Sequence, residues 1–237
     1  MRDRVGGLAK RDLRPEIMDQ PGLDVGLHRQ ALEGLARINA VSLTASRVWA
    51  TIVAERVVGP EVRMLDLACG GGDVTIGVWR RAQRAGIGLR ITGIDRSDVA
   101  VDHARARAAR DGAAVRFERG DVCNDPLPSG YDVVMSSLFL HHLDVDTAVA
   151  VLRRMAGASR DLVLVDDLVR SRGGLALARL GTRLLSRSDV VHSDGPSSVL
   201  AAFTPSELKE LAIRAGLRRR RVQLCWPARM MLTARVT

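Results

Sequence analysis

Cysteine and long apolar runs are scarce in this chain of 237 residues. The three cysteines, Cys69, Cys123 and Cys225, are odd in number and widely spaced. The sequence therefore predicts neither a disulfide framework nor a zinc site, and it favours a reducing compartment. The N-terminal residues lack the apolar stretch of a signal peptide, and no apolar run is long enough to span a bilayer. We therefore expect a soluble, cytoplasmic protein.

Aromatic side chains make up only 3% of the residues, although the formal net charge is +9. A basic protein can bind nucleic acid. Here, few aromatic side chains are available to stack on unpaired bases. The arginines are also scattered, and their one run, residues 218–221, precedes a predicted terminal strand, where solvated side chains are expected. A nucleic-acid partner is therefore not favoured.

The fold class follows from the order of apolar segments between residues 63 and 166. Strands and helices alternate there, which predicts an α/β fold with a mostly parallel sheet and helices on both faces. The length and the 46% hydrophobic content suffice for one such domain with a helical cap. We place the helical cap at residues 1–60, with helices that start near Asp24 and before Val48, and the α/β domain at residues 61–237.

A run of three glycines joins the first predicted strand to the helix that follows it. Asp66 lies near the end of the strand, Gly70–Gly72 follow, and the helix begins before Val74. Such a turn lets a ligand approach the backbone, and the free N–H groups at the helix start face that ligand. The stretch lacks the last glycine of the dinucleotide fingerprint and the lysine of a phosphate loop. The turn therefore predicts another nucleotide-like cofactor.

The segment from Leu65 to Gly72 resembles the first motif of class I S-adenosylmethionine (SAM) methyltransferases, an acid followed by three spaced glycines. The chain departs from that motif at Ala68, where the family usually has glycine. The alanine methyl group is tolerable if the local φ is negative. The resemblance implies a Rossmann-like, seven-stranded sheet that ends in an antiparallel hairpin. It also implies SAM as cofactor and S-adenosylhomocysteine as product.

Polar side chains lie at the ends of the next strands. Asp95 ends the second strand, where a carboxylate can accept both hydroxyls of a ribose. Asp121 follows the third strand, and in the resembling family an acid there reaches the adenine amino group. Ligands of such sheets bind beyond the carboxyl ends of the strands. The predicted cofactor-binding residues are Asp66, Ala68, Cys69, Gly70, Gly72, Asp95, Arg96, Asp121, Val122 and Ser137.

Two adjacent histidines follow the fourth strand, beside the expected position of the methionine part of the cofactor. A histidine oriented by an aspartate is a suitable base for a hydroxyl acceptor. We predict His141 as the base, with His142 as the second candidate. The predicted catalytic aspartate is Asp166, which precedes Asp167 at the end of the fifth strand. A purely structural role for these histidines stays open. His192 is interpreted as a residue of a lid.

A metal is not predicted, although two histidines and two aspartates could bind one. Metal-dependent catechol-type relatives place an acid after the fourth strand, where this chain has Ser136 and Ser137.

Residues 168–203 are predicted to be an insertion that covers the substrate. Leucines and arginines in 172–187 indicate an amphipathic helix, and residues 191–196 are expected to form a loop. A capping box at Thr204, with Pro205 at the first helical position, predicts a helix that ends at Gly216. Strands near 219–225 and 229–235 close the chain.

The lid and the N-terminal helices favour a small hydrophobic or aromatic acceptor, and we expect a monomer or homodimer. Residues 15–19, 34–39 and 226–232 resemble bacterial methyltransferases of aromatic polyketide tailoring, which implies O-methylation of a phenolic or polyketide metabolite. The alternatives are a C-methyltransferase of the quinone-biosynthesis type, an RNA methyltransferase and a non-catalytic SAM-binding protein. An NAD(P) oxidoreductase fits less well.

Overall fold

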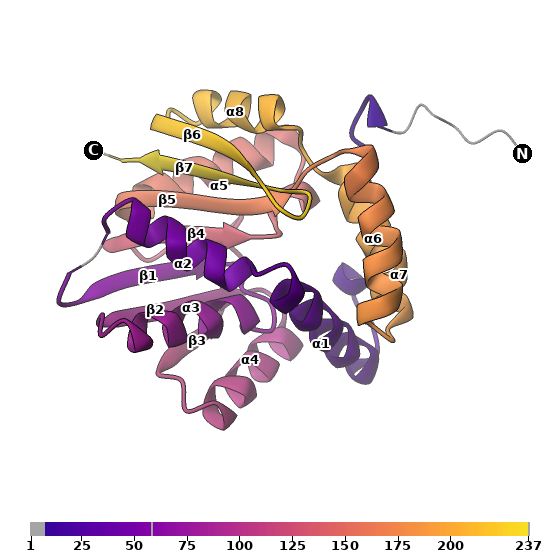
Figure 1. Ribbon diagram of the computed structural model, residues 1–237, viewed down its shortest axis with the longest axis horizontal. Helices are drawn as coiled ribbons and strands as arrows, with labels where there is room; N and C mark the ends of the chain where they lie inside the picture. Colours follow the sequence, from indigo (N-terminus) through magenta and orange to yellow (C-terminus); the bar gives the residue numbers. More distant parts are fainter. Residues whose placement is uncertain (1–7, 58, 237) are drawn as a thin grey trace, which may run out of the picture.

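The computed structural model describes residues 8–57 and 59–236, and its centre is one seven-stranded sheet in the order β3-β2-β1-β4-β5-β7-β6. Strands β1 to β5 are parallel, and β7 is antiparallel to both β5 and β6. The strands are β1 (Val62–Leu67), β2 (Leu89–Asp95), β3 (Val115–Arg119), β4 (Tyr131–Ser137), β5 (Ser159–Leu168), β6 (Arg218–Cys225) and β7 (Arg229–Arg235). The predicted mostly parallel sheet with an antiparallel C-terminal hairpin is confirmed (Figure 1).

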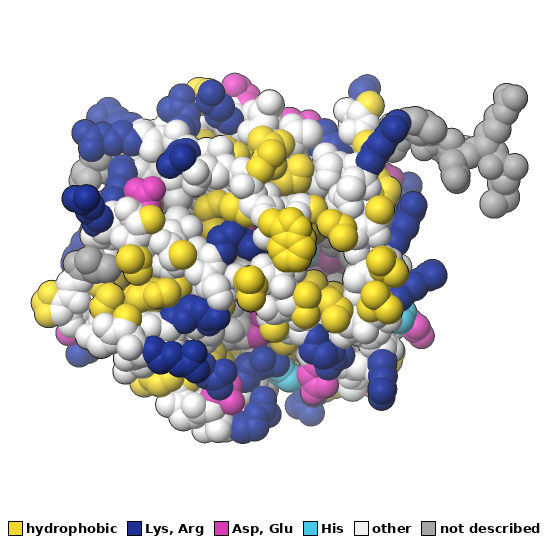
Figure 2. Space-filling model, in the orientation of Figure 1, with side chains coloured by type: hydrophobic (Ala, Val, Ile, Leu, Met, Phe, Trp, Pro, Cys, Tyr) yellow, Lys and Arg dark blue, Asp and Glu magenta, His cyan; other side chains and the backbone are white. Residues whose placement is uncertain are grey.

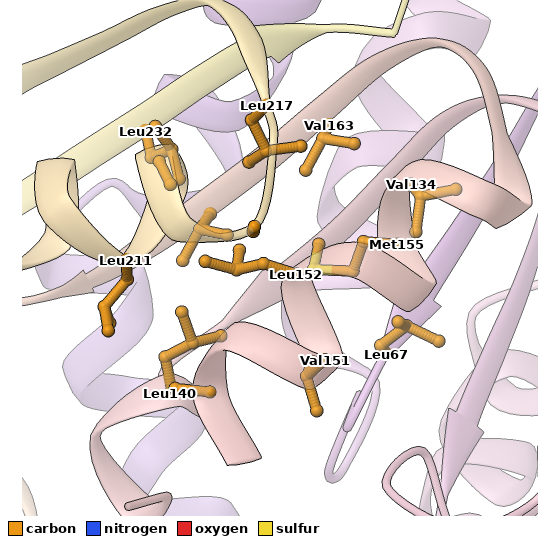
Figure 3. Close-up of a cluster of buried hydrophobic side chains, with 14 of the residues drawn as sticks. Leu67, Val134, Leu140, Val151, Leu152, Met155, Val163, Leu211, Leu217 and Leu232 are labelled. Carbon is orange, nitrogen blue, oxygen red and sulfur yellow. The ribbon is translucent and has the colours of Figure 1, made fainter. Parts of the chain in front are cut away.

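Helices cover both faces of the sheet, because successive residues of each central strand point to opposite faces. Figure 3 shows part of the largest apolar cluster, in which Leu67 of β1 lies with Leu152 of α5 (Val145–Ala158) and Leu211 of α8 (Pro205–Arg214). Leu65 of β1 belongs to the same cluster. Its neighbour Met64 packs on the other face, against α2 (Thr44–Ala54) and α3 (Asp73–Arg84). Helix α4 (Asp98–Arg110) covers β3 through Phe117.

The predicted helix boundaries rest on caps that the structure contains. The Ser97 side chain accepts from the Ala100 N–H at the start of α4. Thr204 and Glu207 form the predicted capping box of α8, and Gly216 follows that helix with φ +77°. These local hydrogen bonds satisfy backbone groups that a helix end leaves unpaired.

Two further helices, α6 (Arg172–Leu185) and α7 (Asp189–Ala201), follow β5 and stand beyond the carboxyl ends of the parallel strands (Figure 1). The loop expected at residues 191–196 is wrong, because this segment lies inside α7, which includes Pro196. Ser188 caps the helix, and the buried Asp194 carboxylate accepts from the backbone N–H groups of Ile17 and Met18. Burial and these long-range hydrogen bonds outweigh the loop-like composition.

The N-terminal part divides its contacts between the sheet and α6–α7. Helix α1 (Val25–Val41) lies between α4 and the α6–α7 pair (Figure 1). Val48 and Ile52 of α2 belong instead to the apolar core on the α3 face of the sheet. Before α1, residues 11–19 cross the site, and η2 (Ile17–Asp19) packs on α7; we call residues 11–19 the strap. Among the described residues, no helix is both long and apolar enough to cross a bilayer.

Candidate active site

A cavity of about 1740 Å³ opens at the carboxyl ends of β1, β2 and β4, between the sheet, the strap, α1 and α6–α7. Pockets for one small ligand usually measure about 300–1,000 Å³, so this cavity has room for a cofactor and an acceptor together. With the exception of Gly72, each predicted cofactor-binding residue lines the cavity, and so do His141 and His142. Asp166 does not line it.

The glycine turn between β1 and α3 has a strained backbone. Ala68, Gly70 and Gly72 all have positive φ, of 55°, 52° and 72°. The negative φ that would suit an alanine at position 68 is therefore not present, and the Ala68 conformation is one that glycine adopts more easily. A Cβ atom on Gly72 would lie 2.6 Å from the Phe117 ring, whereas one on Gly70 would meet nothing within 4 Å. Gly72 thus serves packing, and Gly70 leaves space for a ligand.

Two residues that line the cavity each have a buried oxygen with no hydrogen-bond partner. Asp66 accepts from the Thr75 hydroxyl with Oδ2 at 2.5 Å, and its Oδ1 is unpaired, as is the Ser137 Oγ. Burial raises the pKa of Asp66 to about 7, against the lowering effect of the Thr75 hydrogen bond. Buried polar atoms usually have partners. These unpaired atoms in the cavity are therefore consistent with a polar ligand such as the amino-acid part of SAM.

Asp95 and Asp121 hold their loops as well as facing the cavity. Asp95 accepts from the Gly70 N–H at 2.8 Å and from the Ser97 N–H at 2.9 Å. Asp121 accepts from the Cys123 N–H and from the Asn124 amide. A carboxylate has about four acceptor positions, so each can still accept from ribose or adenine. The set Asp66, Asp95, Asp121 and Ser137 around an open glycine turn fits SAM.

His141 is paired with Asp167, and not with the predicted Asp166. Its Nδ1 lies 2.6 Å from Asp167 Oδ1, and its backbone N–H donates to Asp167 Oδ2 at 3.1 Å. Asp166 points away into a buried ion pair: the Arg47 Nε and Nη2 donate to its two oxygens at 3.0 and 3.1 Å. Successive residues of a strand point to opposite faces, so these neighbours cannot share one role.

The strap brings two more carboxylates to the histidines. Glu16 lies 3.7 Å from His141 Nε2 and 3.8 Å from His142 Nε2, and its Oε1 accepts from the Ser198 hydroxyl. Asp19 lies 2.8 Å from His142 Nδ1 and also forms an ion pair with Arg96 at 3.0 Å. The strap thus connects the predicted base with the predicted cofactor side of the cavity.

His141 is buried among these charges, which changes its titration. Burial alone lowers its pKa, but the charges and hydrogen bonds of Asp167 and Glu16 prevail and raise the pKa to about 10. The same contacts lower the pKa of Glu16 and of Asp167 against the effect of burial. The contacts with Asp167 and Glu16 therefore favour the protonated form of His141.

Glu16, His141 and His142 could also hold a metal ion, because one ligand atom of each lies within 4.8 Å of the others. Two imidazoles and a carboxylate are a common donor set for divalent transition metals.

A buried polar network under the glycine turn was not predicted. Arg229 donates to Asp166 at 3.4 Å and to the Asn39 amide oxygen at 3.2 Å. The Asn39 amide donates in turn to Asp73, which follows the last glycine. The strap and network residues Glu16, Asp19, Asn39, Arg47, Asp73 and Arg229 come from distant parts of the chain. Of the residues around His141 that were not predicted, only Asp167 could have been found from the sequence, because it lies at the end of a predicted strand.

Comparisons with known proteins agree with this geometry. Residues 64–161 match a family model described as a methyltransferase domain. A demethylmenaquinone methyltransferase of Thermus thermophilus is 29% identical over 166 residues, which cover 65% of this chain and 73% of the relative.

Similar solved structures are methyltransferases as well. The mitomycin 7-O-methyltransferase is 26% identical, with a TM-score of 0.60 over 84% of this chain and 55% of its own. Human N-acetylserotonin methyltransferase in complex with SAM shares the fold, with 20% identity and a TM-score of 0.65 over 90% of this chain and 56% of its own. The chain thus spans little more than half the length of these two structures.

The fold and the cavity are those of class I SAM-dependent methyltransferases. With the matching methyltransferase domain over residues 64–161, the chain is a transferase that uses SAM as its cofactor.

Proposed function

We propose that the enzyme transfers the methyl group of SAM to a hydroxyl oxygen of a small aromatic acceptor, with His141 as general base and Asp167 as its orienting acid. The single observation that carries this proposal is the buried His141–Asp167 pair, because His141 lines the same cavity as the glycine turn. His142 remains the second candidate for the base. S-adenosylmethionine supplies a methyl group already activated on a sulfonium.

The chain's own residues would align the acceptor and receive its proton. The acceptor hydroxyl would take the place next to His141 Nε2 that Glu16 approaches, and its proton would pass to that nitrogen. As the oxygen takes the methyl group, the bond between the methyl carbon and the sulfonium sulfur would break, with S-adenosylhomocysteine as the leaving group. Loss of the Glu16 contact removes one of the charges that raise the pKa of His141. Positioning of this kind can lower a barrier by about 7–11 kcal/mol in favourable intramolecular cases.

An aromatic acceptor is supported by the apolar lining of the cavity. Leu13, Met18, Leu35, Ile38 and Leu185 contribute side chains to it. Among the similar structures are an O-methyltransferase of neocarzinostatin biosynthesis with 1,4-dihydroxy-2-naphthoic acid and a family 2 O-methyltransferase with apigenin. Both ligands are hydroxylated aromatics, and we propose the same class here, in secondary metabolism. The cysteines are free, which suits the cytoplasm.

The test is methyl transfer from labelled SAM to a panel of phenols, naphthols and hydroxylated naphthoates, with product masses and fragmentation. We expect a single oxygen-linked methyl group on at least one acceptor. The His141→Ala variant should bind SAM normally in calorimetry and lose turnover, and His192→Ala, whose ring contacts the Ser186 carbonyl, should keep it. Wild-type turnover in His141→Ala would refute the base.

A second candidate is C-methylation of a quinol-type ring, which the similarity to the demethylmenaquinone methyltransferase favours. A carbon-linked methyl group in the same product analysis would support it over O-methylation.

A further inference from the structure

Helix α6 exposes three of its five leucines, whereas its fully buried positions hold small residues, the reverse of an ordinary surface helix. Leu177, Leu180 and Leu184 form one stripe, and their side chains are 49%, 59% and 73% exposed. The buried positions of the same helix are Gly174 and Thr182. A surface helix normally turns its apolar stripe toward the core. The outward stripe of α6 therefore has no partner among the described residues.

Two neighbouring segments extend this apolar surface. The β6–β7 turn presents Leu224 and Trp226, which are 71% and 74% exposed, and the α1–α2 corner presents Val41 and Leu43. Hydrogen bonds join these segments: Arg37 donates to the Leu185 carbonyl at 2.7 Å, and Arg47 to the Trp226 carbonyl at 3.1 Å. We call the seven side chains the apolar rim: Val41, Leu43, Leu177, Leu180, Leu184, Leu224 and Trp226.

The apolar rim adjoins the active-site cavity. Val41, Leu177 and Trp226 each belong to the rim and also line the cavity. Figure 2 shows hydrophobic side chains gathered on the face that carries α6, the β6–β7 turn and the end of α1, with basic side chains among them. An apolar surface that continues into a ligand cavity provides an unbroken path for an apolar molecule.

The charge on α6 has one sign. Arg172, Arg179, Arg183 and Arg187 are exposed, and residues 172–187 contain no acidic side chain. A helix with leucines on one face and arginines beside them is typical of helices that lie in a membrane interface. Tryptophan, present at the β6–β7 turn, is also enriched at that depth.

We propose that the apolar rim and four arginines, three in α6 and Arg187 just after it, dock on the surface of an anionic lipid bilayer. Leu180, Leu184 and Trp226 enter the interface, and the arginines contact lipid phosphates. A second copy of the chain is the weaker partner, because a two-fold interface through α6 would bring two sets of arginines together. The docking surface also narrows the acceptor class, and this step rests on the proposed function. The acceptor is then a hydroxylated aromatic with a lipid-like tail, which passes from the bilayer into the cavity.

Co-sedimentation with vesicles tests the docking without any acceptor. The full chain is expected to bind vesicles of phosphatidylglycerol and phosphatidylcholine, and to bind pure phosphatidylcholine roughly tenfold more weakly. The double variant Leu180→Glu/Leu184→Glu should bind anionic vesicles roughly tenfold more weakly than the wild type. Its matched control, Val145→Glu/Ile213→Glu, changes two exposed apolar residues of α5 and α8 and should bind like the wild type.

Two further measurements separate this proposal from the proposed function. SAM affinity and turnover of a water-soluble acceptor should be equal in Leu180→Glu/Leu184→Glu and the wild type, because neither leucine lines the cavity. Equal sedimentation of the double variant, the control and the wild type would overturn the docking surface. Dimers in light scattering that dissociate in the double variant would assign the rim to a second copy instead.

Discussion

Asp167 contacts His141 twice, through the ring Nδ1 at 2.6 Å and through the backbone N–H at 3.1 Å. One carboxylate therefore fixes both the orientation of the imidazole and the turn η3 (Leu140–His142) that carries it. The remaining ring nitrogen, Nε2, faces Glu16 and the cavity. This arrangement separates a nitrogen that is held from a nitrogen that can react, as a general base requires.

The Asp167→Asn variant tests the orienting acid. The amide keeps the shape but removes the negative charge, so turnover should fall by about 10²–10⁴-fold with SAM affinity unchanged. Single-turnover rates with labelled SAM and calorimetry measure the two effects. Asp161→Asn, at the other end of β5, is the control and should retain wild-type turnover. Loss of SAM binding in Asp167→Asn would show a structural role instead.

The pH dependence of stability should report the His141 ion pairs. The folded-state pKa of about 10 lies above the ordinary value near 6.5, so the stabilisation is complete below about pH 6.5. It is lost as pH rises from there toward 10. Urea unfolding at pH 6, 8 and 10 should show this loss in the wild type and a smaller one in His141→Gln. Parallel curves for both proteins would contradict the ion pairs.

The Asp166→Ala variant should unfold more easily, because Asp166 is the common partner of Arg47 and Arg229. Asp166 and Arg229 are both buried, and removing one partner of such a pair typically costs about 3–5 kcal/mol. Urea denaturation measures the change. Asp12→Ala breaks the exposed pair with Arg14 and should cost less than about 1 kcal/mol. Equal stability of the two variants would show that the buried network is dispensable.

The parts of the fold that sequence predicts well are those with local causes. The strand that ends at Asp95, the Ser97 cap and the Thr204 capping box depend on residues within a few positions of each other, and the structure contains all three. The alternation of strands and helices was sufficient to predict the mostly parallel sheet, because the rules for crossover connections allow few topologies.

The errors concern side chains whose partners are distant in sequence. In the sequence, Asp166 and Asp167 are two adjacent acids at the end of one strand, and nothing local distinguishes them. Which of the two contacts His141 depends on the twist of the strand and on Arg47, which is 119 residues from Asp166 and binds it. Glu16 is held near the histidines by α7, where Asp194 accepts from the strap backbone and the Ser198 hydroxyl donates to Glu16. Residues 191–196 look like a loop because their many small and polar residues satisfy turn statistics. These residues are helical because α7 is buried against other parts of the protein, which local composition does not reveal.

The glycine turn yields a pair of opposite predictions. Gly72→Ala places a Cβ against Phe117 at a positive φ, and should destabilise the protein by about 2–4 kcal/mol. Ala68→Gly relieves a positive φ and should stabilise it by up to about 1 kcal/mol. Thermal unfolding checks both. Gly157→Ala, with open space around its Cβ, is the control and should not destabilise. Destabilisation by Ala68→Gly would show that the methyl group packs usefully.

Removal of metal ions should leave methyl transfer unchanged, because the described contacts of Glu16, His141 and His142 form a complete ion-pair cluster. Each histidine Nδ1 has a carboxylate, and both Nε2 atoms lie within 3.8 Å of Glu16. Dialysis against a chelator, followed by turnover assays with and without Zn²⁺, Co²⁺ or Mn²⁺, measures this. Activity that is lost on dialysis and restored by one of these ions would make the cluster a metal centre.

The Glu16→Gln variant further distinguishes an ion-pair cluster from a metal centre. Without the charge of Glu16, the pKa of His141 should fall toward its ordinary value, because one of the charges that raise it is gone. The pH–rate curve, which should rise with deprotonation of His141, therefore moves to lower pH in Glu16→Gln. A metal ligand would behave differently: its loss should weaken metal affinity by about 10-fold or more and reduce the rate at every pH.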